Sequence, residues 1–244
     1  MKSFGKTDVG KKRKINQDYL FYSDAPVGCF PNLYIVADGM GGHKAGDKAS
    51  SLAVNRFVEL AGQQKRELPF LTMDRLLRQV NEEVHKVSER EEEFAGMGTT
   101  FVAATVLDQN AYIMNVGDSR LYYYHKGSLR QVTLDHSLVE ELVRAGQIDA
   151  QESRNHPQKN IITRAVGVSD EVTPDFFQIR MEKDSRILLC SDGLSNMVDD
   201  EDLTEILSGG GTEEDQVEKC IEEALFYGGA DNIAVLIARQ DDGR

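Results

Sequence analysis

The sequence predicts an α+β layered sandwich in a single domain that spans residues 1–244. Short runs of aromatic and β-branched residues, typical of strands, occur in groups, and longer amphipathic segments separate the groups. Helices that do not alternate one for one with strands disfavour a doubly wound parallel sheet. With 40% hydrophobic and 28% charged residues and no Pro-rich or Ser-rich linker, the chain is typical of one globular unit with a substantial core.

The first elements follow from hydrophobic spacing. After a basic opening, two apolar runs bounded by Pro, Gly and Asn predict strands at 18–24 and 32–38. Apolar residues then recur at helical spacing from Ala49 and from Met73, which predicts two amphipathic helices joined near Pro69.

Further along the chain, apolar runs of strand length are separated by short turn-like segments and predict an antiparallel meander over 99–107, 111–116 and 120–125. A short helix is expected to end at Gly146, and the polar segment 147–160 is expected to be a mobile surface segment. The remaining patterns predict strands at 175–180 and 186–192, a last helix over 213–225 and a closing strand at 232–238.

Charge and cysteine usage exclude several classes of protein. A net charge of -13 disfavours binding to nucleic acid or to anionic membranes, so a phosphate-bearing substrate needs local positive charge or bound cations. The three cysteines are widely spaced without a CxxC pair, which predicts reduced thiols and a cytoplasmic protein. No run approaches the ~18 apolar residues of a membrane span, and the amino terminus lacks the apolar stretch of a signal peptide.

Four aspartates beside Gly, Asn or Gln adjoin apolar runs: Asp18, Asp38, Asp192 and Asp231. Each alone has an ordinary explanation, since Asp-Gly is a common turn dipeptide and Asp caps many helices. Together they suggest a cluster of ligands for Mg²⁺ or Mn²⁺, because close carboxylates repel one another unless cations lie between them. Two such ions ~3.5–4 Å apart activate water for phosphoester hydrolysis. A guanidinium such as that of Arg13 could grip the phosphate.

The combination of motifs is more specific than any single aspartate. Between about Gly5 and Ala238, the chain resembles the metal-dependent serine/threonine protein phosphatases, the PPM or type 2C class, in their compact bacterial form. The motifs are, in order, RKINQD at 13–18, VADGMGGH at 36–43, GMGTT at 96–100, VGDSRLY at 116–122, TLDHS at 133–137, NIITRAVG at 160–167, CSDGL at 190–194 and GGADNIAV at 228–235.

This resemblance implies a four-layer α-β-β-α sandwich, in which two antiparallel sheets are flanked by antiparallel helices and the metal centre lies at one edge. A flap over about 137–160 would lie beside the catalytic cleft and contact the substrate. By resemblance, Asp38 bridges two Mn²⁺ or Mg²⁺ ions and the carbonyl oxygen of Gly39 completes one coordination sphere. Asp192 and Asp231 would bind the first ion.

The second and third ions are less well defined by the sequence. Asp18 would act at the second site chiefly through water, because Gln17 stands where eukaryotic relatives carry a Glu. Asp118 matches a residue that binds a third ion together with Asp192, although 117–119 could instead be a hairpin turn. Arg13 matches the position that holds the substrate phosphate.

The proton donor to the leaving alkoxide stays open. Eukaryotic relatives place a His directly after the first Asp-Gly pair, where this chain has Met40, and His43 follows three residues later. Either His43, a metal-bound water or no group donates the proton, and His43 could equally orient its loop. His136 is interpreted as structural, and Asn16 and Asn232 as residues that hold loops.

The sequence therefore predicts a monomeric phosphatase that releases phosphate from phosphoserine and phosphothreonine on proteins. The bacterial resemblance suggests a cognate serine/threonine kinase and its substrates as partners. Two alternatives remain: an inactive relative that binds phosphoproteins, and an enzyme of the same fold that acts on a small phosphoester or on one regulatory protein. Loss of a metal aspartate would indicate the inactive relative, and none is lost.

Overall fold

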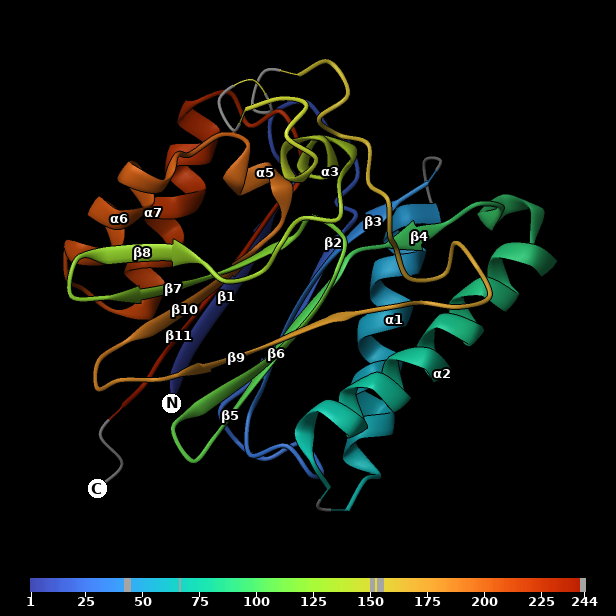
Figure 1. Ribbon diagram of the computed structural model, residues 1–244, viewed down its shortest axis with the longest axis horizontal. Helices are drawn as coiled ribbons and strands as arrows, with labels where there is room; N and C mark the ends of the chain where they lie inside the picture. Colours follow the sequence, from blue (N-terminus) through green and yellow to red (C-terminus); the bar gives the residue numbers. More distant parts are fainter. Residues whose placement is uncertain (42–44, 66, 150–151, 153–155, 242–244) are drawn as a thin grey trace.

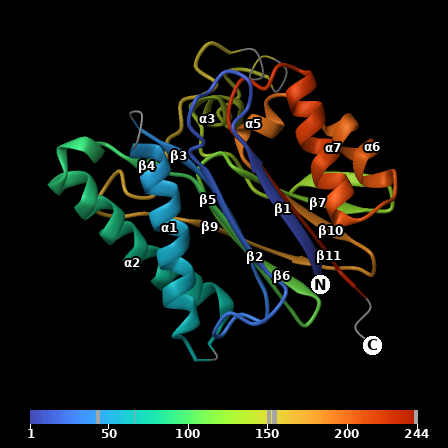
Figure 2. The same ribbon diagram turned by 180° about the vertical axis from the view of Figure 1, so that it is seen from behind.

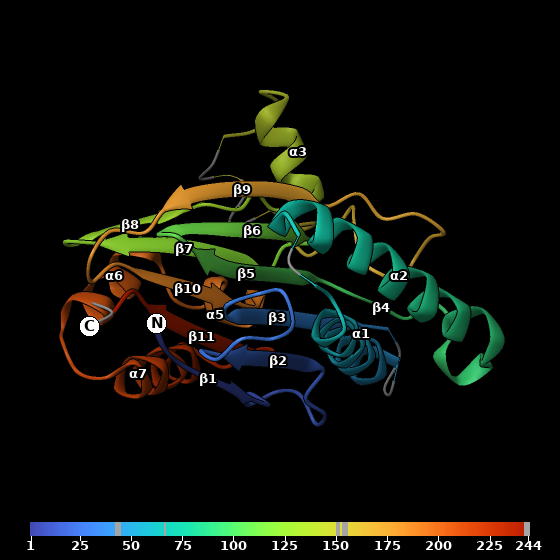
Figure 3. The same ribbon diagram turned by 90° about the horizontal axis from the view of Figure 1, so that it is seen from below.

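The computed structural model describes residues 1–41, 45–65, 67–149, 152 and 156–241. Two antiparallel sheets lie face to face and helices cover the outer face of each, which confirms the predicted sandwich (Figures 1 and 3). The strands are β1 (Lys2–Asp8), β2 (Asp18–Ser23), β3 (Leu33–Met40), β4 (Gly98–Thr99), β5 (Phe101–Leu107), β6 (Asn110–Val116), β7 (Arg120–His125), β8 (Ser128–Gln131), β9 (Asp175–Arg180), β10 (Arg186–Cys190) and β11 (Ile233–Arg239). The helices are α1 (Ala45–Gly62), α2 (Pro69–Arg90), α3 (Leu138–Arg144), α5 (Asp192–Ser195), α6 (Asp200–Ser208) and α7 (Glu213–Phe226), with a 3₁₀ turn at Glu92–Phe94.

The two sheets take their strands from both halves of the chain. One has the order β1-β11-β10-β7-β8, and the other has the order β2-β3-β5-β6-β9 with β4 paired to β3. Because β1 pairs with β11 along its whole length, the two ends of the described chain lie at the same end of the sandwich (Figure 1). This closure brings the first and last motifs of the sequence together.

Alternating side chains build three apolar layers. Along β3, Leu33 and Ile35 face α1 and α2, whereas Tyr34 and Val36 face the other sheet. On the opposite side of the molecule, a third layer lies between the first sheet and helices α6 and α7. The period of two in the strands and of 3.6 in the helices thus assigns each apolar residue to a layer. All three cysteines are free thiols, as predicted.

Two sequence expectations about strands were wrong. The basic opening contains β1, which we missed because Gly5 and two lysines weaken its apolar pattern; it is an edge strand that pairs only with β11. The predicted meander is also wrong in part: β5 and β6 pair, but β7 joins the other sheet beside β10. The chain crosses between the sheets at 117–119, and Gly117 takes a φ of 103° there.

The helices begin earlier than the apolar spacing alone indicates. Pro69 is the first residue of α2 and not part of the connection before it, since a proline in the first turn gives up an amide that lacks a helical partner anyway. Thr212 and Asp215 form a capping box at the start of α7. Among the described residues, no helix is both long enough and apolar enough to cross a bilayer.

Candidate metal centre

The fold gathers the predicted aspartates at one end of the sandwich. Asp18 starts β2 and lies directly opposite Asp38 in the antiparallel β2–β3 pair. Asp192 is the first residue of α5, just after β10, and Asp231 lies just before β11. Asp118 lies in the crossover from β6 to β7. Strand ends from both sheets therefore deliver all five carboxylates to the same place.

The carboxyl groups are close enough to perturb one another. The side chain of Asp38 contacts those of both Asp18 and Asp192. Burial, followed by the charge of Asp18 and the other aspartates, raises the pKa of Asp38 well above its usual range. Burial is also the main cause that raises the pKa of Asp18 to about 7 and that of Asp118 to about 8, with Asp192 adding repulsion in both cases. These carboxyl groups need neighbouring positive charge to ionise together.

The donor set fits hard divalent cations. Asp18 is 5% exposed; its Oδ2 accepts a hydrogen bond from the Ser191 hydroxyl at 2.6 Å, and its Oδ1 is buried without a hydrogen-bond partner in the described part of the chain. An unpaired buried carboxylate oxygen is costly unless it meets a cation. In the described part of the chain, however, no three carboxylate, imidazole or thiol groups converge closely enough to hold an ion by themselves. Water and backbone carbonyls would have to complete the coordination, as Mg²⁺ commonly requires.

Glycines allow the backbone segments of the centre to approach closely. A Cβ on Gly39 would lie 2.0 Å from the carbonyl oxygen of Gly46, so β3 touches the first turn of α1 backbone to backbone. A Cβ on Gly193 would lie 1.9 Å from the carbonyl oxygen of Asn232. The Asp-Gly pairs therefore place carboxylates where the chain packs against itself. At 38–39 the turn interpretation is wrong, because both residues belong to β3.

Arg13 reaches the centre from the β1–β2 connection. Its Nη2 donates to Asp231 Oδ2 at 2.6 Å, although half of the arginine side chain stays exposed. Asn232 holds the same connection: its side-chain amide donates to the carbonyl oxygens of Val9 and Ile15, and its Oδ1 accepts from the Gln17 amide. This agrees with the predicted loop-holding role of Asn232. His43 lies outside the described residues.

The hairpin interpretation of 117–119 is wrong, since β6 and β7 belong to different sheets. His136 supports this crossover from beneath: its Nδ1 accepts from the Gly117 amide at 3.1 Å, and its Nε2 lies 3.1 Å from Asp175 Oδ2. Burial lowers the pKa of His136 and keeps the imidazole neutral. The structural interpretation of His136 accounts for these contacts.

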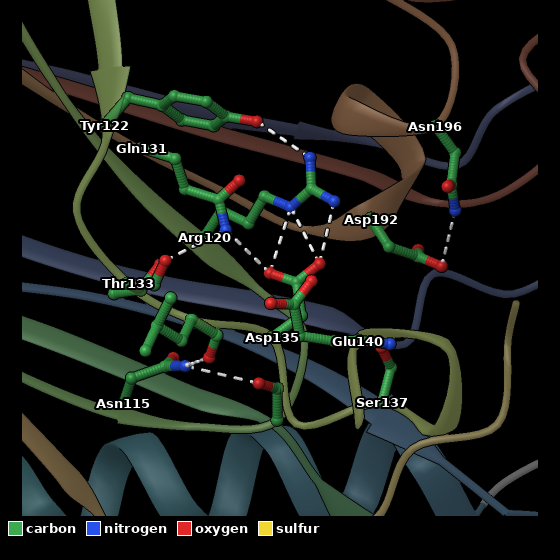
Figure 4. A network of polar contacts seen from close by, with 12 residues as sticks. Asn115, Arg120, Tyr122, Gln131, Thr133, Asp135, Ser137, Glu140, Asp192 and Asn196 are labelled. Atoms are coloured by element: carbon green, nitrogen blue, oxygen red, sulfur yellow. Dashed lines mark hydrogen bonds and ion pairs between the residues drawn. The ribbon is translucent and has the colours of Figure 1, made fainter. Parts of the chain in front are cut away.

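The prediction from the sequence missed a partly buried polar network next to Asp192 (Figure 4). The guanidinium of Arg120 donates to both carboxylate oxygens of Asp135, at 2.7–3.1 Å, and to the Tyr122 hydroxyl at 2.9 Å. Asn196 donates to Asp192 Oδ2 at 3.0 Å. Arg120 lies in the VGDSRLY motif and Asn196 lies four residues after Asp192, a spacing that places the two on one face of a helix. The motif that contains Arg120 and the spacing of Asn196 were the features of the sequence that could have indicated this network.

A cavity of about 280 Å³ opens beside the carboxylates, between the start of α3 and the region around α5. Asp118 and Asp192 form part of its wall, so it communicates with the candidate metal centre. Ser137, Glu140 and Lys159 contribute from the predicted flap. Residues of the segment 137–160 that the structure describes therefore line the same cavity as Asp118 and Asp192.

Comparison with known proteins agrees with this geometry. A sequence profile described as protein phosphatase 2C matches residues 9–219. The serine/threonine phosphatase stp of Listeria monocytogenes is 42% identical over 248 residues, which cover 97% of this chain and 94% of that relative. The protein phosphatase PhpP of Streptococcus pneumoniae is 36% identical over 245 residues, covering 97% and 96% of the two chains.

Solved structures show the same architecture. The serine/threonine phosphatase Stp1 from Staphylococcus aureus superimposes with a TM-score of 0.92 at 32% identity, covering 98% of this chain and 95% of that chain. The catalytic domain of the serine/threonine protein phosphatase PstP, in complex with two manganese ions, gives a TM-score of 0.86 at 32% identity, with 99% and 98% covered. The chain belongs to the protein phosphatase 2C family and is, as its sequence predicts, a metal-dependent serine/threonine protein phosphatase.

Proposed function

We propose that the chain hydrolyses phosphoserine and phosphothreonine on proteins by direct attack of water at a dinuclear centre held by its aspartates. The observation that carries this proposal is the cluster of carboxyl groups around Asp38, in which Asp18 keeps a buried oxygen that has no hydrogen-bond partner among the described residues. When bound, Mn²⁺ or Mg²⁺ supplies a nucleophile from water at neutral pH and neutralises charge on the phosphoryl group. The two manganese ions of the PstP structure support the metal and the number two.

Each aspartate has a separate role within this proposal. Asp38 is the shared ligand, since its carboxyl group contacts both Asp18 and Asp192. Gly39 offers its carbonyl oxygen, and Asp192 and Asp231 bind the first ion. Asp18 serves the second ion, chiefly through water.

Gln17, Asp118 and Arg13 have further roles around the proposed metal centre. Gln17 contributes no charge at the second site, so water makes up more of its coordination. Asp118 and Asp192 share the wall of the cavity, which supports the proposed third ion between them. Arg13 binds the phosphate of the substrate with its guanidinium fork, and its ion pair to Asp231 holds that fork beside the reacting groups.

The proton for the leaving alkoxide comes from His43, from water in the centre, or from no dedicated group. A serine or threonine alkoxide is strongly basic, so a positioned acid would raise the rate by ~10²–10⁴. His43 is the side chain that the sequence nominates, and a His43→Gln variant assayed across pH tests it. Loss of the basic limb of the kcat profile would assign the role to His43.

The cellular setting follows from the same proposal. The substrates are phosphorylated proteins, including a cognate serine/threonine kinase, and the enzyme acts as a cytoplasmic monomer. The complete set of aspartates argues against an inactive phosphoprotein-binding relative.

The test is release of phosphate from a phosphothreonine peptide with and without Mn²⁺. Turnover is expected only with the metal, and Asp192→Ala should lower kcat by roughly 10²–10³, the loss typical when a group that stabilises developing charge is removed. Asp170→Ala, which removes an exposed carboxylate that pairs with His85 of α2, is the matched control and should keep full activity. Metal-independent turnover, or a fully active Asp192→Ala enzyme, would contradict the proposal.

A further inference from the structure

The β1–β2 connection carries four consecutive cations at positions 11–14, and all four are exposed. We call this segment the basic loop. It lies beside the α7–β11 connection, above the end of the sandwich that holds the aspartates (Figure 2). Such a concentration of positive charge stands out in a chain with 41 acidic and 28 basic residues.

Among the residues that the structure describes, the three lysines of the basic loop have no carboxylate partner. Arg13 pairs with Asp231, but none of Lys11, Lys12 and Lys14 forms an ion pair with any residue that the structure describes. Many other cations of the chain do have partners: Lys6, Arg56, Arg75, Arg78, Lys86, Arg120, Arg144 and Arg239. The positive charge of the loop is therefore available to a ligand.

The backbone of the basic loop is fixed in place. Asn232 binds the carbonyl oxygens on both sides of the loop, at Val9 and Ile15, and the Lys11 amide donates to the Gly229 carbonyl at 2.8 Å. Gly10 has a φ of 74°, and a Cβ there would lie 2.1 Å from the Asp231 carbonyl oxygen. A loop held in this way loses little conformational entropy when it binds a partner.

The partner follows from the position of Arg13 within the loop. If Arg13 binds the substrate phosphate, the exposed Lys12 and Lys14, its neighbours in the chain, are close to that phosphate. An extended peptide advances ~3.3 Å per residue, so residues one or two positions from the phosphorylated residue pass over the lysines. Unpaired ammonium groups in that position favour negatively charged side chains and reject positively charged ones.

We propose that the basic loop selects phosphoproteins with acidic residues within two positions of the phosphorylated serine or threonine. This inference rests on the proposed phosphatase function and names its substrate class. The net charge of -13 makes the loop more important, because the rest of the surface repels acidic segments. The same net charge disfavours a membrane surface as the partner.

The experiment compares two phosphothreonine peptides that differ only in flanking Glu or Gln residues. In Mn²⁺ and low salt, the wild-type enzyme should show about tenfold higher kcat/KM on the acidic peptide, through a lower KM at equal kcat, from several exposed charge pairs acting together. The preference should shrink towards 1 M salt, where the screening length falls to ~3 Å. The triple variant Lys11→Gln, Lys12→Gln, Lys14→Gln should lose the preference and keep its kcat/KM on the neutral peptide within about twofold.

The control is a triple Lys→Gln variant with the same change of charge at positions 65, 126 and 183. These lysines lie in the α1–α2, β7–β8 and β9–β10 connections, at the opposite end of the strands from the aspartates. It should keep the acidic preference. Equal turnover of both peptides by the wild-type enzyme would overturn the inference and leave the phosphatase function standing, whereas turnover of neither would overturn the function itself. Loop-dependent binding to vesicles of anionic lipid, without preference between the peptides, would also overturn the inference.

Discussion

The side-chain amide of Asn232 holds the β1–β2 connection at the end of the sandwich where the aspartates lie. Asn232 is 4% exposed, and both its donors and its acceptor meet backbone groups of the β1–β2 connection. Its backbone amide donates to Asp231 Oδ1 at 2.8 Å. The side chain of Asn232 thus fixes the basic loop that carries Arg13, and its backbone amide orients one proposed metal ligand.

Asn232→Ala should lower the free energy of unfolding by about 2–3 kcal/mol, because three hydrogen bonds worth ~1 kcal/mol each are lost and their backbone partners stay near the protein interior. Urea denaturation measures the change. KM for a phosphopeptide should rise as well, since the Arg13 segment loosens. Asn110→Ala, at the far end of β6, should cost less than about 1 kcal/mol and leave KM unchanged. An Asn232→Ala enzyme with wild-type stability would contradict this account.

At the scale of elements, the β6–β7 crossover joins the two sheets and carries Asp118. Gly117 is held by His136, and the Thr100 hydroxyl contacts the Ser119 hydroxyl at 2.7 Å. Immediately after the crossover, Arg120 forms its partly buried ion pair with Asp135 (Figure 4). The start of β7 is thereby fixed to the segment that leads into α3.

Arg120→Ala should destabilise the protein by about 1–3 kcal/mol, because its removal leaves the partly buried Asp135 carboxylate without its ion-pair partner. Arg120→Lys should recover only part of this loss, since an ammonium cannot reproduce the two-pronged contact. Thermal unfolding measures both variants. In the double variant Arg120→Met, Asp135→Leu the cost should fall below that of Arg120→Ala, and a larger cost would show that the pair is not the source of the effect.

For the whole molecule, the candidate metal centre makes the free energy of unfolding depend on pH and on bound metal ions. Asp18 has a pKa of about 7 in the fold against 3.8 when unfolded, and Asp118 one of about 8. A raised native pKa means that the folded chain binds more protons between these values. The contribution of these two carboxyl groups to the free energy of unfolding is therefore most favourable below about pH 4, and it is lost as the pH rises through 7 to 8.

In EDTA, the melting temperature should fall between pH 5.5 and pH 8, and added Mn²⁺ should raise it more at pH 8 than at pH 5.5. An Asp18→Asn, Asp118→Asn variant should show a flatter pH profile without metal and a smaller shift with Mn²⁺. The variant keeps His136, whose lowered pKa acts in the opposite direction, so the difference between the two proteins isolates the carboxylates. Identical profiles for both proteins would contradict the assignment.

The sequence predicted those parts of the fold that depend on local pattern. The apolar run of β3 and the spacing in α7 give strand and helix directly, and motif order placed Asp38, Asp192 and Asp231 in one family pattern. The edge strand β1 escaped prediction because its single pairing tolerates Gly5 and lysines. The transfer of β7 to the second sheet depends on which strand β10 meets, and nothing within β7 itself encodes that choice.

In the candidate site, too, some features could be predicted from the sequence and others depend on the fold. Aspartates after apolar runs were visible as a set, whereas the Arg120–Asp135 pair forms only when β7 and the chain after β8 come together, fifteen residues apart. The role that we propose for Lys11, Lys12 and Lys14 depends on the absence of ion-pair partners among the described residues, which a sequence does not reveal. Asn232 was assigned to loop holding from its motif, and the structure identifies the carbonyls that it holds.

The register of β2 against β3 has an evolutionary consequence. Asp18 and Asp38 face each other across an antiparallel ladder, where like charges weaken strand pairing. Selection for catalysis keeps both, at a cost to the metal-free fold. A lineage released from that selection would gain stability by replacing either aspartate with a neutral residue. Inactive descendants of this enzyme should therefore lose position 18 or 38 early and melt at higher temperatures than their active ancestors.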